Sequence, residues 1–246
     1  MSRRLVALPV AAVALAGTAQ AAGPVVVIDP GHDRRANLAT EPIGPGSATR
    51  KIKDGGGTHG VVTTIREADL VLDVSLRLRA LLRRVGVEVV MTRASTSGAS
   101  MGNVARARIA NRVRASLLLR VHADGHPSSA VRGTHTLVPA LRTGWTDDVY
   151  RPSRRAAALV QAEVVRALGF PDRGIGERSD FTGFNWADVP VILVELGFMT
   201  NPVDDRRLAR SAVRDRAALG LCRGTLRYLG LAPGRCGGLD RAKALR

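Results

Sequence analysis

The sequence is poor in aromatic residues and in acidic side chains, and both shortages narrow what the protein can be. Aromatic residues make up 3% of the 246 positions whereas 45% are hydrophobic, so the core must be built from aliphatic side chains. The length allows one sizeable core. Acidic residues number 21 against 37 lysines and arginines, and the formal charge of +16 favours anionic partners such as nucleic acid, an anionic membrane or an anionic cell wall.

Long hydrophobic runs are also missing. The longest, residues 5–17, is too short to cross a bilayer comfortably, and no other segment approaches a spanning length. It follows two arginines and precedes the small-residue motif Ala-Gln-Ala at 19–21, so we predict a secretory signal peptide over residues 1–21 rather than an uncleaved anchor. Its removal lowers the formal charge from +16 to +14. Export to the periplasm or cell wall argues against a nucleic-acid partner.

Cysteine is scarce, with only Cys222 and Cys236 near the C-terminus. An even pair in an exported protein is usually bridged. We therefore predict a disulfide that ties the tail, from about residue 230, to the last helix. Closing a loop of about 15 residues stabilises by roughly 3 kcal/mol in the chain-entropy model. Two unrelated free thiols are the less favoured alternative.

Apolar runs end in a polar residue at three places. Residues 25–28 lead through Asp-Pro-Gly to His32, residues 116–121 lead to His122, and residues 189–194 lead to Glu195. Such runs are typical of buried strands. Because ligands bind beyond the carboxyl ends of the strands in open α/β sheets, we expect His32, His122 and Glu195 to face one cleft.

The remaining chain alternates helical and strand patterns, which predicts a single α/β domain whose sheet has a parallel core and helices on both faces. Helices are predicted from a cap at Thr63 or Thr64 to Gly86, from Met101 or Asn103 to Arg114, over 154–168 and from Asp204 or Asp205 to about 229. Further strands are predicted over 87–92 and 131–139, the latter at an edge. Residues 34–60 and 172–188 are expected to be loops. The first borders the cleft or forms a loose hairpin without a role. At least two of the aromatic residues Phe181, Phe184 and Trp186 should cover the core, and the arginines of helix 103–114, including Arg106, should face solvent.

His32 and His122 are candidate zinc ligands. Catalytic zinc takes three protein ligands, often two histidines and one carboxylate, and keeps one position open. The third ligand is left open among Glu67, Glu195, Asp33, Asp124 and Asp29. Glu67 lies three residues after Thr64, which fits a helix capping box, and from the spacing alone capping is favoured over a ligand role. Glu195 is a candidate general base, because burial raises a carboxyl pKa, although a glutamate paired with arginine is the alternative.

The other histidines are weaker candidates. His59 and His135 are expected to be solvated or packed, and His126 is the one of the three expected to touch substrate.

These residues resemble a known family. The stretches IDPGHD (28–33), the helix at Glu67, NVARARIANRVRASLLLRVHAD (103–124) and VPVILVELGFMTNPVDDRRL (189–208) are similar, in the same order, to zinc-dependent N-acetylmuramoyl-L-alanine amidases of the Amidase_3 type. The resemblance covers nearly the whole mature chain, residues 22–246, and the four motifs are specific in combination.

The resemblance implies a six-stranded, largely parallel mixed sheet, one zinc ion held by His32, Glu67 and His122, and Glu195 as the catalytic base. It implies hydrolysis of the amide between N-acetylmuramic acid and L-alanine of peptidoglycan stem peptides, in cell separation or wall turnover. Peptidoglycan or muropeptide fragments would be the substrates, and anionic wall polymers would be attracted by the basic surface. A monomer is expected.

The chain departs from the family at Arg120, where many members have serine, and this leaves the substrate preference open. Residues 34–60 are too few and too rich in glycine for the inhibitory helix of some members. Two other functions fit the sequence less well. A non-catalytic wall-binding relative is disfavoured because all four polar positions are retained. A secreted zinc carboxypeptidase-like enzyme would release amino acids from plain peptides.

Overall fold

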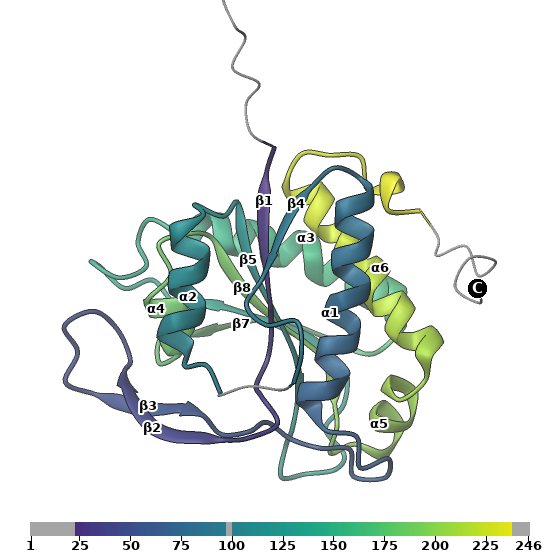
Figure 1. Cartoon of the computed structure of the whole chain (residues 1–246). Coiled ribbons are helices and arrows are strands. Elements are labelled where there is room, and N and C mark those ends of the chain that lie inside the picture. Colours follow the sequence, from purple (N-terminus) through teal and green to yellow (C-terminus); the bar gives the residue numbers. More distant parts are fainter. Residues whose placement is uncertain (1–22, 97–99, 238–246) are drawn as a thin grey trace, which may run out of the picture.

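A six-stranded sheet in the order β4-β1-β5-β8-β6-β7 forms the centre of the computed structural model, which describes residues 23–96 and 100–237 (Figure 1). Its strands are β1 (Val25–Pro30), β4 (Glu88–Met91), β5 (Leu117–Asp124), β6 (Thr134–Pro139), β7 (Asp172–Arg178) and β8 (Val191–Phe198). Only the β6–β8 pair is antiparallel; the other pairs run parallel. The single α/β domain with a largely parallel mixed sheet is therefore confirmed. The predicted signal peptide lies outside the described residues.

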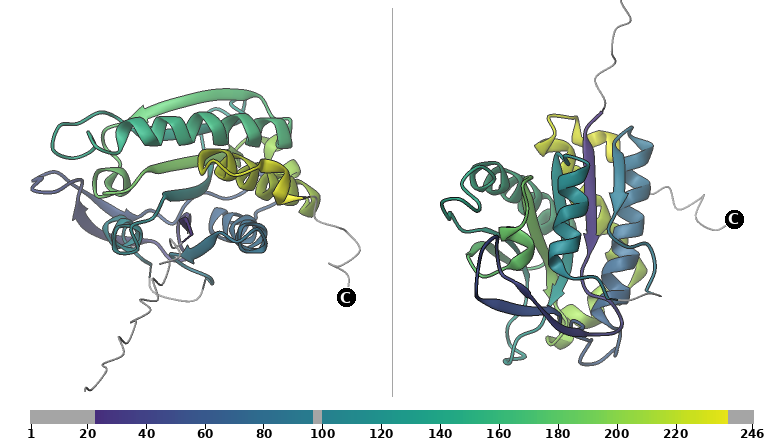
Figure 2. Two further views of the ribbon diagram at one scale, coloured as in Figure 1. Left: turned by 90° about the horizontal axis from the view of Figure 1, so that it is seen from above. Right: turned by 60° about the vertical axis from the view of Figure 1, so that its left-hand side comes forward.

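Side chains alternate between the two faces of this sheet, and each face is covered by helices. Residues such as Ile28, Leu119 and Ile192 join a large aliphatic core. That core lies against α1 (Glu67–Arg84), α3 (Tyr150–Leu168) and α6 (Ser211–Tyr228). Val27 and Leu118 join a smaller cluster with α2 (Asn103–Arg112) and α4 (Thr182–Asn185). Figure 2 (right) shows β1, in purple, between α2 and α1.

The expected loop 172–188 contains β7 and α4, and β7 rather than β6 is the edge strand. The β7 sequence, DRGIGER, lacks an apolar alternation because the strand is largely exposed, whereas Thr134 and Thr136 of β6 are fully buried. The predicted placement of β6 at an edge is therefore wrong. Phe184 is buried, and Phe181 and Trp186 pack against the same cluster, as expected for core cover.

The predicted C-terminal helix is two helices, α5 (Pro202–Leu208) and α6. The cap of α5 is Asn201, whose side chain accepts hydrogen bonds from the amides of Val203 and Asp204. The predicted caps have other roles: Asp205 is buried and accepts hydrogen bonds from Val62 and Thr63. This contact ties the loop before α1 to α5.

Residues 34–60 form a β-hairpin of β2 (Asn37–Pro42) and β3 (Arg50–Asp54), which lies beneath α2 (Figure 1). The buried Glu41 joins the two, because its carboxylate accepts hydrogen bonds from the amides of Asn103 at 2.7 Å and Val104 at 3.2 Å. A carboxylate at a helix N-terminus satisfies free amides and complements the helix dipole. The hairpin is therefore fixed to the domain and carries the end of β3 to the carboxyl edge of the sheet.

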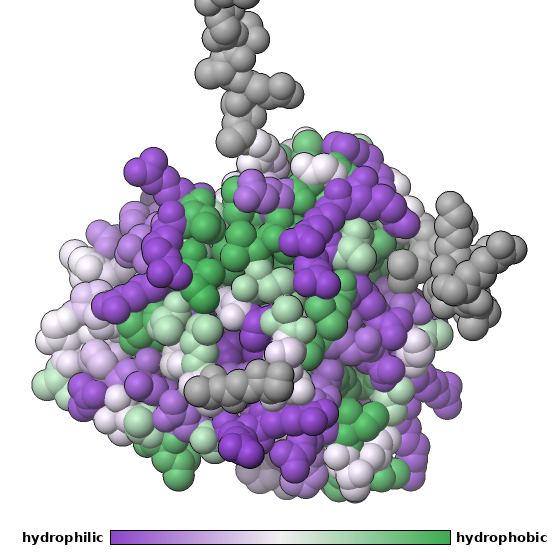
Figure 3. Space-filling view, viewed as in Figure 1, coloured by the Kyte–Doolittle hydropathy of each residue, from purple (hydrophilic) through white to green (hydrophobic). Residues whose placement is uncertain are grey.

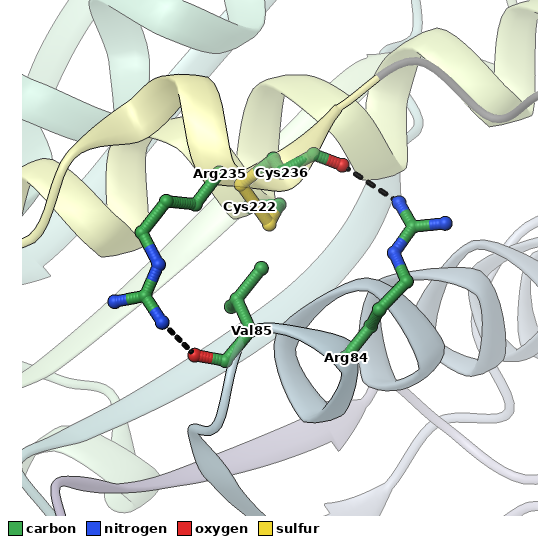
Figure 4. Close-up of a disulfide and its surroundings, with 5 residues drawn as sticks. All are labelled: Arg84, Val85, Cys222, Arg235 and Cys236. Carbon is green, nitrogen blue, oxygen red and sulfur yellow. Dashed lines mark hydrogen bonds between the residues drawn. A yellow bond between two sulfur atoms is a disulfide. The ribbon is translucent and has the colours of Figure 1, made fainter.

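The predicted disulfide is present between Cys222 of α6 and Cys236 of the short 3₁₀ helix η1 (Pro233–Cys236). Two arginines reinforce it, because Arg84 donates to the Cys236 carbonyl at 2.8 Å and Arg235 donates to the Val85 carbonyl at 2.7 Å (Figure 4). The described part of the tail is thus tied both to α6 and to the end of α1.

Hydrophilic side chains cover much of the face shown in Figure 3, with apolar patches between them. Within the described ranges, none of the helices combines the length and apolar character that crossing a membrane requires.

Candidate metal centre

The carboxyl ends of β1, β5 and β8 bring the predicted site residues together. His32 follows β1, His122 lies near the end of β5, and Glu195 lies beside it on β8 in the strand register. Glu67 is the first residue of α1 and is buried. All four side chains line one cavity of about 460 Å³.

Two glycines allow the backbone to approach these side chains closely. A Cβ atom on Gly31 would lie 2.3 Å from Cε1 of His122. A Cβ atom on Gly57, which has a φ of +72°, would lie 2.8 Å from Oε2 of Glu67. Only glycine fits either position without displacing a site residue.

His32, Glu67 and His122 each offer a ligand atom, and these atoms lie within 4.8 Å of one another. Oε1 of Glu67 is 3.0 Å from Nδ1 of His122 and 3.5 Å from Nε2 of His32. Nε2 of His122 is buried and has no hydrogen-bond partner among the described residues. Two imidazoles, one carboxylate and an unpaired ring nitrogen form a donor set that suits a zinc ion.

The electrostatics of the cluster favour a cation. Burial lowers the pKa of His122 to about 4, so this imidazole is neutral near pH 7 and its ring can donate a lone pair. Burial alone would raise the pKa of Glu67, but His32, His122 and the Thr58 amide outweigh it and hold that pKa below its ordinary value. The centre therefore combines a carboxylate with a neutral imidazole.

Asp54, at the end of β3, was not identified from the sequence. Its Oδ1 lies 2.7 Å from Nδ1 of His32, and its carboxylate also accepts hydrogen bonds from the amides of Asp33 and Gly56. Histidines that bind metals usually have a carboxylate or carbonyl on the second ring nitrogen, which orients the ring. A carboxylate beside each predicted histidine ligand could have been expected from this pattern. The sequence does not show, however, that β3 ends beside His32.

Glu195 is buried, and its Oε2 has no hydrogen-bond partner among the described residues. This speaks against the alternative of a glutamate paired with arginine. Burial raises the pKa of Glu195 well above its ordinary value, and the negative charges of Glu67 and Asp124 raise it further. A carboxyl group whose pKa is raised is a stronger base than an exposed glutamate and can accept and return a proton during a reaction.

Two of the other candidate ligands are engaged elsewhere. Asp29 pairs with Arg106 at 2.6 Å and Arg120 at 2.7 Å, and Asp33 accepts a hydrogen bond from Arg106 at 2.8 Å. Arg106, expected on a solvated face, is 3% exposed. The prediction that Arg106 faces solvent is wrong, because its guanidinium pairs with the buried carboxylates of Asp29 and Asp33. Asp124 lines the cavity but is outside the cluster of three ligand atoms.

The predicted capping box at Thr64 and Glu67 is absent. The N-cap of α1 is Arg66, without a side-chain cap, and Glu67 faces the histidines. His126 lines the cavity, where a substrate could contact it. His59 is exposed and forms an isolated β-bridge with Arg66. His135 stacks on Phe198 with ring centroids 5.4 Å apart.

Known proteins are similar to this chain in both sequence and fold. Residues 26–227 match the Amidase_3 family, described as N-acetylmuramoyl-L-alanine amidase. An N-acetylmuramoyl-L-alanine amidase of Mycobacterium tuberculosis is 32% identical over 237 residues, which cover 91% of this chain and 93% of that protein. The crystal structure of an N-acetylmuramyl-L-alanine amidase from Mycobacterium smegmatis has a TM-score of 0.77 at 30% identity, covering 85% of this chain and 98% of that chain. One from Mycobacterium abscessus has a TM-score of 0.76 at 28% identity, covering 85% and 99%. With this agreement along most of its length, the chain belongs to the Amidase_3 family of N-acetylmuramoyl-L-alanine amidases.

Proposed function

We propose that the protein is an exported, zinc-dependent N-acetylmuramoyl-L-alanine amidase that cleaves the amide between N-acetylmuramic acid and L-alanine of peptidoglycan stem peptides. The observation that carries the proposal is the convergence of His32, Glu67 and His122 beside Glu195 in one cavity of a chain from this family.

The three ligand residues fit zinc by type and separation, and Glu67 and His122 also fit it by protonation state. Zinc bound there would supply a Lewis acid that polarises the amide carbonyl and makes a nearby water more acidic. Asp54 would keep the His32 ring oriented through its 2.7 Å contact with Nδ1.

Glu195 is assigned the proton transfers. Its carboxylate accepts a proton from the attacking water as the water oxygen bonds to the amide carbon. The same carboxyl group then gives that proton to the amide nitrogen as the carbon–nitrogen bond breaks, so the products are a lactyl carboxylate and a free alanine amino group. A raised pKa suits this exchange, because it makes Glu195 a stronger base than an exposed glutamate.

The proposed setting follows from the sequence. A signal peptide over residues 1–21 would export the chain, and the basic surface would attract anionic wall polymers once it is outside. We propose that the enzyme acts as a monomer.

The test is to purify the mature protein, measure its metal content and digest peptidoglycan and a muramyl peptide. About one zinc per chain, new N-terminal alanine, loss of activity with a chelator and recovery with zinc are expected. A folded protein that binds no metal and releases no N-terminal alanine would contradict the proposal. Release of single amino acids from plain peptides would instead indicate a carboxypeptidase.

A further inference from the structure

A second cavity, of about 250 Å³, adjoins the metal centre and shares His32, His122 and Glu195 with it. One wall is Lys51 and Ile52 of the hairpin strand β3, and the opposite wall is the segment Asp180–Thr182. Lys51 bridges the two walls through an ion pair of 2.7 Å with Asp180. The cavity therefore extends the site into the space between the hairpin and α4.

Arg120 lies in this cavity as a fixed, buried cation. It precedes His122 by two residues on β5, so the two side chains are on the same face of the sheet. Its side chain is 6% exposed. Nε donates to Asp29 at 2.7 Å and Nη2 donates to Asn103 at 2.6 Å. These two bonds hold the guanidinium in one orientation.

The remaining nitrogen of Arg120, Nη1, has no acceptor among the described residues. It lies against Gly183, where a Cβ atom would be only 2.3 Å away. Thr182, the neighbour of this glycine, lines the cavity together with Arg120. A side chain that lines the cavity thus has a nitrogen without an acceptor among the described residues, and a glycine provides the room for it.

The ion-pair partner of Arg120 is shared with another arginine. Its partner Asp29 is shared with Arg106, which also pairs with Asp33. Arg93 lies 3.8 Å from Asp33, so three buried arginines share two aspartates. Asp180, the acidic residue on the opposite wall, is already paired with Lys51 and Arg178. The cavity therefore presents a buried guanidinium whose ion-pair partner is shared, and Glu195, which is assigned the proton transfers, is the other acidic residue that lines it.

We propose that this cavity is a subsite for a carboxylate of the substrate, namely the one on the residue that follows alanine, and that Arg120 recognises it. The proposal rests on the proposed function. A guanidinium suits a carboxylate because it is permanently charged and offers N–H groups in a planar fork. One extended residue spans roughly 3.5 Å, so a carboxylate on the next residue can reach a cavity that shares Glu195 with the metal centre. Family members with serine at position 120 would lack this cation.

The first experiment needs no variant. The wild-type enzyme is given two muramyl dipeptides that differ only in whether the carboxyl group of the second residue is free or amidated. The free acid should have the higher kcat/KM, by roughly tenfold or more, since a hydrogen bond between charged groups is lost in the amide. Equal rates, or faster cleavage of the amide, would overturn the subsite. Failure to cleave either compound or peptidoglycan would count against the amidase function instead.

Arg120→Ser tests the residue itself. The ratio of the two kcat/KM values should fall towards one, because serine cannot reach the carboxylate. A general effect on Glu195 or on folding would change both rates and leave the ratio intact. Arg50→Ser is the matched control, because it removes the same charge from β3 outside this cavity and should preserve the ratio.

Gly183→Ala is the second variant if Arg120→Ser does not fold. Its methyl group would displace Nη1 while retaining the charge, so the ratio should again fall. An unchanged ratio in either folded variant would show that Arg120 does not bind the carboxylate.

Discussion

Two buried polar clusters lie side by side at the carboxyl edge of the sheet, and they differ in how fully their atoms are paired. Asp29 accepts hydrogen bonds from Thr92 at 2.6 Å, Arg106 at 2.6 Å and Arg120 at 2.7 Å. At the candidate metal centre, Nε2 of His122 and Oε2 of Glu195 are buried without a partner among the described residues. An unpaired buried polar atom costs roughly 1–3 kcal/mol, so such atoms persist where a function needs them.

The same contrast appears in the ionisation of two buried carboxyl groups. Burial would raise the pKa of Asp29, but Arg106 and Arg120 outweigh it and lower that pKa below its ordinary value. Burial raises the pKa of Glu195, and Glu67 and Asp124 raise it further. The paired cluster therefore holds a permanent carboxylate that fixes the structure, whereas the unpaired cluster holds a carboxyl group poised to exchange a proton.

Glu195→Gln should produce the largest effect, because it removes the proton exchange and keeps the shape. We expect kcat to fall by roughly 10³-fold. Zinc content should be unchanged. The melting temperature should not fall, because Oε2 of Glu195 makes no hydrogen bond with the described residues that the substitution could remove. Steady-state kinetics, metal analysis and thermal unfolding check this. Turnover close to that of the wild type would show that Glu195 is not the base.

His122→Ala should remove the metal and with it the stabilisation that the metal provides. A ligand that binds only the folded state at about 1,000 times its Kd stabilises by roughly 4 kcal/mol. We therefore expect added zinc to raise the melting temperature of the chelator-treated wild type but not that of His122→Ala. The exposed His59 supplies a matched control, and His59→Ala should respond to zinc as the wild type does. A full zinc response in His122→Ala would place the metal elsewhere.

Arg106→Met breaks the paired cluster instead. It leaves Asp33 without its 2.8 Å partner and Asp29 with one arginine instead of two. Breaking a buried ion pair from one side typically costs about 3–5 kcal/mol, and we expect a loss of that size in the free energy of unfolding from urea titrations. Arg108→Met, on the exposed face of the same helix, should cost under about 0.5 kcal/mol. Equal losses in the two variants would show that the Arg106 network contributes nothing particular.

The sequence predicted the strands correctly where burial alone determines the pattern of apolar residues. Strands β1, β5 and β8 are covered on both faces, so their apolar runs and the polar residues that end them are visible without a structure. The resemblance to the family added Glu67, which local spacing could not separate from a helix cap. Its role depends on where α1 meets β5, and that is a tertiary relationship.

The missed features depend on contacts between distant segments. Arg106 has the spacing of a solvated arginine, and only the position of Asp29 and Asp33 beneath α2 explains its burial. Asp54 reaches His32 because Glu41 fixes the hairpin to α2. The strand β7 was not predicted, because an edge strand without buried residues needs no alternation of apolar and polar side chains.

His135 provides the smallest test, because one of its ring nitrogens is buried without a partner while the other lies 3.5 Å from Asp124. Its Nδ1 lacks a partner among the described residues, and burial followed by the charge of Arg173 lowers its pKa from 6.5 to about 4. Between these values the unfolded chain binds a proton that the folded protein does not. The stability that the neutral His135 ring contributes is therefore fully present above about pH 6.5, and it is lost as the pH falls towards 4.

His135→Phe retains a ring against Phe198 and removes this titration. Between about pH 7.5 and pH 4.5, the wild type should lose on the order of 2 kcal/mol more unfolding free energy than the variant. Urea titrations at the two pH values measure this difference, and comparing the two proteins cancels the shared groups that do not contact residue 135, which leaves Asp124 as the neighbour that changes with it. Parallel pH dependences would mean that His135 titrates normally in the folded protein, and that an unpaired buried nitrogen outside the metal centre carries no measurable cost.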